Sequence, residues 1–209
     1  MSITWDWLGR VPYLDCLQRQ RDRRNAVLDG SAQEVVWLVE HPRTVTVGRR
    51  PAPGTPTPEA LARHGIAFAK VERGGLATWH GPGQLVIYPI LSLPQRGFTV
   101  RAYIHRLEQG IIDWLAPYGV DAVRRAGAPG VWVDNDKIAA LGVHIRHGVS
   151  IHGIAVNVAP DLGDYAHIVP CGLEGVGVTS LAQLGVRTDS LEKLAMDLGP
   201  ELALRLSIH

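Results

Sequence analysis

The sequence has few cysteines, no long apolar run and almost no net charge, and each shortage excludes a class of protein. Two cysteines far apart, Cys16 and Cys171, do not make a disulfide framework and favour a reducing cytoplasm. No apolar run approaches the roughly 18–20 residues that span a bilayer, and the N-terminus lacks the basic and apolar segments of a secretory signal. A formal net charge of +1 gives no field for general nucleic-acid binding. We therefore expect a cytoplasmic protein that binds neither nucleic acid nor membrane.

The length and the balance of residues fit one globular domain. The chain has 209 residues, of which 46% are hydrophobic and 20% charged. That length is enough to bury a full core, and those fractions are typical of globular proteins. Since no repeat, low-complexity stretch or linker interrupts the chain, we expect residues 1–209 to form a single domain, most simply a monomer.

Hydrophobic patterning predicts many strands and a few helices. The clearest helix is Thr99–Tyr118, in which apolar residues recur at helical spacing, and Glu34–Glu40 has the length and β-branching of a buried strand. This mixture predicts an α/β or α+β fold. The other expected helices are Tyr13–Leu28, Pro58–His64 and Ser190–Leu206, and the other expected strands are 3–8, 44–47, 66–72, 85–91, 121–125, 130–134, 137–146 and 149–158.

A glycine-rich segment, residues 73–84, lies between two of these apolar strands. It reads Arg-Gly-Gly-Leu-Ala-Thr-Trp-His-Gly-Pro-Gly-Gln, with four glycines and one proline in twelve residues. Glycine loses much backbone entropy on ordering, so this density suits unusual φ angles or the close approach of another molecule. The alternative is a hairpin with solvated polar side chains, but a hairpin loop usually needs only two to five residues. We therefore interpret 73–84 as a rigid ligand-binding loop.

Two more clusters carry reactive side chains. Cys171 stands between Pro170 and Gly172, at a turn rather than inside an apolar run, and the glycine-rich backbone after it can offer N–H groups to an oxyanion. A free thiol is only about 3% thiolate at pH 7, so a nucleophilic role needs a positive neighbour. Lys137 opens an otherwise apolar strand. The alternatives are a small buried hydrophobe for Cys171 and a solvated turn residue for Lys137.

These motifs, in this order, resemble the lipoyl(octanoyl) transferase family. The resemblance rests on residues 73–84, Lys137 with the strand after it, the His-Gly-x-Ala-x-Asn of 152–157 and the Pro-Cys-Gly of 170–172. An ordered set over about two-thirds of a chain is far more specific than any one motif. The resemblance implies the catalytic-domain fold of biotin and lipoate protein ligases: one domain with a larger sheet packed against helices, and a smaller sheet.

The resemblance also implies a reaction and a set of site residues. Cys171 would take an octanoyl group from the phosphopantetheine arm of acyl carrier protein, and Lys137 would lower the thiol pKa and move protons. The acceptor would be a lysine in the lipoyl domains of 2-oxoacid dehydrogenases and the glycine cleavage H protein, with no cofactor, ATP or metal. The residues expected to line the acyl tunnel are Arg73, Gly74, Gly75, Leu76, Ala77, Thr78, Trp79, His80, Ala140, Leu141, Gly142, Gly153, Ile154 and Ala155.

Two positions depart from the family pattern. Trp79 stands where tyrosine is usual and Ala140 where serine is common, so neither supplies a hydroxyl. His80 fits either an acyl-positioning or a structural role. Cys16, in an amphipathic helix, fits core packing.

Other functions remain possible from sequence alone. An ATP-dependent lipoate or biotin ligase would share the glycine segment and the lysine but needs no Pro-Cys-Gly nucleophile. A non-catalytic acyl-binding module would not need Cys171 and Lys137, and a papain-like hydrolase would have an aromatic-flanked cysteine. A metal site at His144, His147 and His152 is disfavoured, because the first two point to opposite faces of a strand. For an acidic carrier protein, a local basic patch at Arg43, Arg49 and Arg50 is the candidate docking surface.

Overall fold

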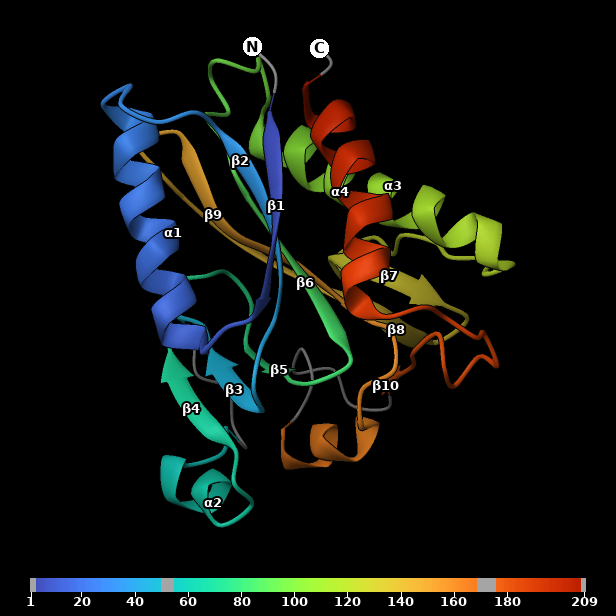
Figure 1. The fold of residues 1–209 in the computed structure, drawn as a ribbon. Helices are drawn as coiled ribbons and strands as arrows, with labels where there is room; N and C mark the ends of the chain where they lie inside the picture. Colours follow the sequence, from blue (N-terminus) through green and yellow to red (C-terminus); the bar gives the residue numbers. More distant parts are fainter. Residues whose placement is uncertain (1–2, 50–54, 169–175, 208–209) are drawn as a thin grey trace.

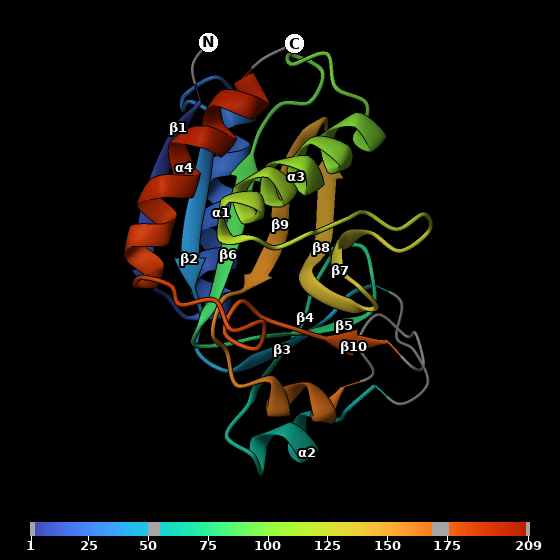
Figure 2. The same ribbon diagram turned by 90° about the vertical axis from the view of Figure 1, so that its right-hand side faces the viewer.

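The computed structural model describes residues 3–49, 55–168 and 176–207. Within these ranges a seven-stranded sheet has the order β1-β2-β6-β9-β8-β10, with β7 paired to β8, and a three-stranded sheet has the order β4-β3-β5. Figure 1 shows the smaller sheet below the larger one, and Figure 2 shows helices α3 and α4 lying along one face of the larger sheet. The predicted fold class, a mixed α/β fold with a larger and a smaller sheet, is confirmed.

The elements follow the predicted order closely. The strands of the larger sheet are β1 (Thr4–Arg10), β2 (Val35–Glu40), β6 (Gln84–Ile90), β7 (Gly130–Val133), β8 (Asp136–Arg146), β9 (Val149–Asn157) and β10 (Gly177–Val178). Those of the smaller sheet are β3 (Thr44–Val47), β4 (Ala67–Lys70) and β5 (Ala77–His80). The helices are α1 (Tyr13–Leu28), α2 (Pro58–Ala62), α3 (Val100–Leu115) and α4 (Leu191–Ser207), with short 3₁₀ helices at Ala116–Tyr118 and Leu162–His167.

Strand β2 shows why this sheet is covered on both faces. Val36 and Leu38 belong to the core cluster that contains residues of α3 and α4. Val35, Trp37 and Val39 belong to a second cluster, with Cys16 and Val27 of α1. Since successive side chains of a strand point to opposite faces, a continuous apolar run needs apolar cover on both. The expectation that Cys16 packs in the core is confirmed, because its side chain is fully buried.

Two segments differ from the sequence-based expectation. Residues 121–125 form no strand; Val123 makes a single bridge to Trp132. A third of the glycine-rich segment is not a loop, because residues 77–80 form β5 and pair antiparallel with β3. None of the helices in the described ranges combines the length and the apolar character needed to cross a membrane.

Gly153, in the middle of β9, must be glycine for a packing reason. A Cβ there would lie 2.0 Å from the carbonyl oxygen of Ile87 on the neighbouring strand. Gly153→Ala is therefore expected to destabilise the protein by about 1–3 kcal/mol, as overpacking does. The measurement is chemical denaturation. Gly74→Ala is the matched control, because its Cβ would have only an ordinary contact, 3.6 Å from the oxygen of Val143; equal losses in both variants would refute the argument.

Candidate active site

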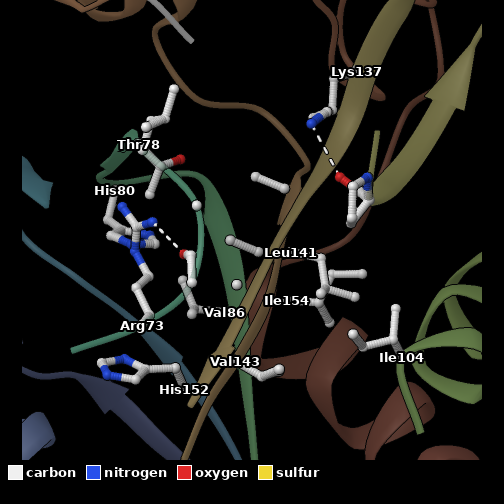
Figure 3. Close-up of a pocket in the computed structure, with 18 of the residues that line it drawn as sticks. Arg73, Thr78, His80, Val86, Ile104, Lys137, Leu141, Val143, His152 and Ile154 are labelled. Atoms are coloured by element: carbon white, nitrogen blue, oxygen red, sulfur yellow. Dashed lines mark hydrogen bonds between the residues drawn. The ribbon is translucent and has the colours of Figure 1, made fainter. Parts of the chain in front are cut away.

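A cavity of about 380 Å³ lies between the glycine-rich segment and strands β8 and β9 (Figure 3). Lys137 lines it, as do all the residues expected to line the acyl tunnel except Trp79. Cys171 lies outside the described residues. The cavity is also lined by residues that the sequence did not single out for it: Tyr13, Val86, Tyr88, Ile104, Gly127, Ala128, Pro129, Val143 and His152.

Lys137 is held inside this cavity rather than in solvent. It is the second residue of β8 and is only 6% exposed. Its Nζ donates a hydrogen bond of 3.1 Å to the carbonyl oxygen of Pro129, shown in Figure 3, and lies 4.6 Å from the centre of the Trp132 ring. The interpretation of Lys137 as a solvated turn residue is therefore wrong. A buried ammonium group at the edge of an apolar cavity is able both to stabilise a nearby anion and to transfer a proton.

Arg73 fastens the glycine-rich segment to the smaller sheet. Its guanidinium group donates to the carbonyl oxygen of Thr46 at 2.7 Å, to the Thr46 hydroxyl at 2.8 Å and to the carbonyl oxygen of Gly74 at 3.0 Å. Gly48 allows the same close approach, because a Cβ there would lie 2.1 Å from the carbonyl oxygen of Gly75. These hydrogen bonds hold the segment against the smaller sheet, where it forms one wall of the cavity.

The hydrogen bonds of Gln84 fix the tautomer of His80. The amide nitrogen of Gln84 lies 2.9 Å from Asn157 Oδ1 and 3.2 Å from the carbonyl oxygen of Trp79, and both atoms only accept. Gln84 Oε1 is therefore the atom that receives the hydrogen bond of 2.8 Å from His80 Nδ1. Burial lowers the pKa of His80 well below its usual value. The ring is thus neutral at pH 7, with its proton on Nδ1 and a lone pair on Nε2.

His152 and Tyr13 add a second buried polar pair to the cavity wall. The Tyr13 hydroxyl lies 3.3 Å from His152 Nδ1, and its ring stacks on His80 with 5.3 Å between centroids. Burial lowers the pKa of His152 to about 3, so this ring is also neutral at pH 7. His152 has a φ of 59°, which is uncommon for a residue other than glycine and marks a locally constrained backbone.

Among the additional residues that line the cavity, some lie in a sequence motif and others have only the pattern of core residues. His152 belongs to the His-Gly-x-Ala-x-Asn motif, but the sequence suggests no role for its side chain other than a disfavoured metal site. Tyr13 and Ile104 have helical spacing like that of core residues. Their place in the cavity depends on how α1 and α3 pack on the sheet, which no local pattern records.

Trp79 does not line this cavity, contrary to expectation. Its side chain is 1% exposed and packs in the core of the smaller sheet, with its ring 5.5 Å from that of Tyr165. The alternation of β5 explains this, because Thr78 and His80 reach the cavity while Trp79 points to the other face. This position of the Trp79 ring also requires glycine at residue 81, because a Cβ there would lie 2.1 Å from the ring.

The basic patch expected from Arg43, Arg49 and Arg50 is only partly available. Arg43 is paired with Asp164 through two hydrogen bonds of 2.7 and 2.5 Å, so its charge is neutralised locally. Arg49 is exposed, and it donates to the carbonyl oxygen of Glu72 at 2.8 Å and contacts His144 Nδ1 at 2.6 Å. Arg50 lies outside the described residues.

Comparison with solved structures reports on the fold. A lipoate-protein ligase A bound with ATP matches with a TM-score of 0.75 at 17% identity, covering 100% of this chain and 87% of the other. A bipartite lipoate protein ligase of Thermoplasma acidophilum gives 0.76 at 18% identity, covering 100% and 85%. The biotin protein ligase of Aquifex aeolicus gives 0.58 at 11%, covering 97% and 70%. The chain therefore has the fold of these ligases.

Comparison of sequences is more specific. The model of the lipoyl protein ligase A/B catalytic domain matches residues 12–202. The octanoyltransferase of Burkholderia thailandensis is 41% identical over 194 residues, which cover 90% of this chain and 74% of the relative. The octanoyltransferase of Azoarcus sp. (strain BH72) is 44% identical over 184 residues, which cover 87% and 78%. The chain belongs to the lipoyl protein ligase A/B catalytic-domain family, and within it to the octanoyltransferases, which are acyltransferases.

Proposed function

We propose that this octanoyltransferase takes its acyl group from a thioester on the phosphopantetheine arm of acyl carrier protein and passes it, through a thioester on Cys171, to a lipoyl-domain lysine. In the first half-reaction the Cys171 thiolate attacks the carbonyl carbon. The bond from that carbon to the pantetheine sulfur breaks, and Lys137 protonates the departing sulfur. In the second, the acceptor amine attacks the Cys171 thioester, and its proton passes to Lys137.

The observation that supports this proposal is the buried Lys137 at the edge of a largely apolar cavity. An octanoyl chain needs apolar walls, and residues such as Leu141 and Ile154 supply them (Figure 3). The Lys137 ammonium group supplies the proton that the leaving sulfur needs. The thioester is already activated, so the reaction as proposed needs no ATP, cofactor or metal. The proposed acceptors are the lipoyl domains of 2-oxoacid dehydrogenases and the glycine cleavage H protein.

The test is intact-protein mass spectrometry after mixing the enzyme with octanoyl-acyl carrier protein in the absence of ATP. We expect a mass gain of one octanoyl group that hydroxylamine removes and that a lipoyl domain accepts. An ATP-dependent ligase would instead modify the lipoyl domain only when free octanoate and ATP are supplied. Transfer with no acyl-enzyme at any time point would leave an octanoyltransferase but refute the covalent route.

A further inference from the structure

Arg24 on α1 is buried without a polar partner. The residue is 6% exposed, and its Nε is buried with no hydrogen bond. No hydrogen bond or ion pair joins its side chain to any residue in the described ranges. Of the guanidinium nitrogens only Nε is fully buried, so Nη1 and Nη2 remain open to an anion from solvent. Arg24 therefore lacks an anionic partner in the described part of the chain.

Its neighbours along α1 place Arg24 beside the end of the β8–β9 hairpin. One turn earlier, the Oε1 atom of Gln20 accepts a hydrogen bond of 2.8 Å from the backbone N–H of His152. One turn later, Val27 belongs to the same buried cluster as Val149. Val149 is opposite Arg146 in the β8–β9 register, and Figure 1 shows α1 running alongside β9. Arg24 and Arg146 therefore approach the same place from two elements.

More positive charge gathers at this place. Arg146 is exposed and has no acidic partner among the described residues. Burial and then the charge of Arg146 lower the pKa of Arg24, so the two guanidinium groups repel each other. His144 lies on the same face of β8 as Arg146, two residues earlier, and it contacts Arg49 at 2.6 Å. Side chains from α1, from β8 and from the segment after β3 thus converge.

The nearby acidic side chain is already occupied. Both oxygens of Glu72 accept hydrogen bonds from Arg21, at 2.9 and 2.8 Å. The pKa of Glu72 is lowered to about 2, because hydrogen bonds and positive neighbours outweigh the effect of burial. With Arg21 and Glu72 neutralising each other, the charges of Arg24, Arg49 and Arg146 remain without a carboxylate within the described ranges.

We propose that Arg24, Arg49, His144 and Arg146 form a binding site for a phosphate-type oxyanion, at the end of the cavity marked by His152. Guanidinium groups from three directions suit the tetrahedral oxygens of a phosphate better than the single planar edge of a carboxylate. The site is separate from Lys137: Val143, opposite His152, lies six residues further along β8, which corresponds to about 20 Å of extended strand. The ligand is free phosphate or the phosphate of a larger molecule such as a pantetheine arm.

The first test is isothermal titration calorimetry of the whole protein with inorganic phosphate at constant ionic strength. We expect saturable binding that Arg24→Leu weakens by about tenfold or more, since hydrogen bonds to a charged partner are the strong ones. Arg23→Leu is the matched control, because Arg23 lies on the same helix but stacks on Trp37 at 5.5 Å. The phosphate affinity of this variant should equal that of the wild-type protein. No saturable binding, or an equal loss in both variants, would overturn the proposal.

A second variant distinguishes the loss of the phosphate site from a loss of folding. Arg146→Gln changes an exposed side chain and should also reduce phosphate affinity several-fold. Arg24→Leu keeps an apolar stem and removes a charge that is repelled by Arg146, so in chloride buffer it should unfold at the wild-type temperature or above. Unchanged phosphate affinity in a folded Arg24→Leu protein would refute the site.

The source of the phosphate is identified by comparing two probes. If the site holds the phosphate of a pantetheine arm, 4′-phosphopantetheine should bind more tightly than inorganic phosphate, and Arg24→Leu should reduce that advantage. Equal affinities would assign the site to the free ion. Neither probe carries an acyl group, so these results do not depend on the route of octanoyl transfer.

Discussion

Replacing Cys171 with serine is expected to reduce octanoyl transfer by on the order of 10³-fold or more, while leaving the protein folded. Without a dedicated base, a serine hydroxyl is a far poorer nucleophile than a thiolate. The measurement is transfer of octanoyl from carrier protein to a lipoyl domain, with the melting temperature recorded for the same samples. A Cys171→Ser protein that transfers at the wild-type rate would disprove the covalent route.

Cys16 is the matched control for this experiment. Burial raises the pKa of the Cys16 thiol to about 11, so at neutral pH it stays protonated and shielded from solvent. Cys16→Ser should therefore keep its acyl transfer activity. In the wild-type protein, iodoacetamide at pH 7 should label Cys171 first. Preferential labelling of Cys16 would contradict both the role of Cys171 and the burial of Cys16.

The sequence predicted best where local pattern and tertiary environment agree. The run that forms β2 is apolar on both faces, so it is stable only as a buried strand. The Thr99–Tyr118 pattern has apolar residues on one face of a helix, and α3 forms there at Val100–Leu115, followed by a 3₁₀ turn. The motifs containing residues 73–80, 140–142 and 153–155 also come together in one cavity, with Trp79 as the exception. Glycines inside such motifs reflect close backbone contacts, as Gly83 and Gly153 show.

It predicted less where a partner strand decides the outcome. The glycines on both sides of residues 77–80 predict a loop, yet pairing with β3 makes these residues a strand and turns Trp79 away from the cavity. Residues 121–125 look like a strand by composition, but only Val123 finds a partner, at Trp132. Strand formation depends on neighbours distant in sequence, which the local pattern does not contain.

Lys137→Ala is expected to slow both half-reactions, by about 10²–10⁴-fold, the usual contribution of a positioned proton donor or acceptor. It should also raise the pH at which Cys171 is alkylated, by roughly 1 unit or more, because the thiolate would lose its positive neighbour. Lys193→Ala is the control: Lys193 is an exposed lysine paired with Asp189 at 2.8 Å, and its loss should change neither property.

Lys137→Arg separates charge from proton transfer. Arginine stays protonated in proteins, so this variant should retain much of the lowered thiol pKa and part of the acyl-enzyme formation. It should fail in the second half-reaction, where the acceptor amine must lose a proton and arginine cannot accept it. Single-turnover measurement of each half-reaction, starting from isolated acyl-enzyme for the second, resolves the two roles. If Lys137→Arg passes octanoyl to a lipoyl domain at the wild-type rate, Lys137 acts through its charge alone, because the proton must then leave by another route.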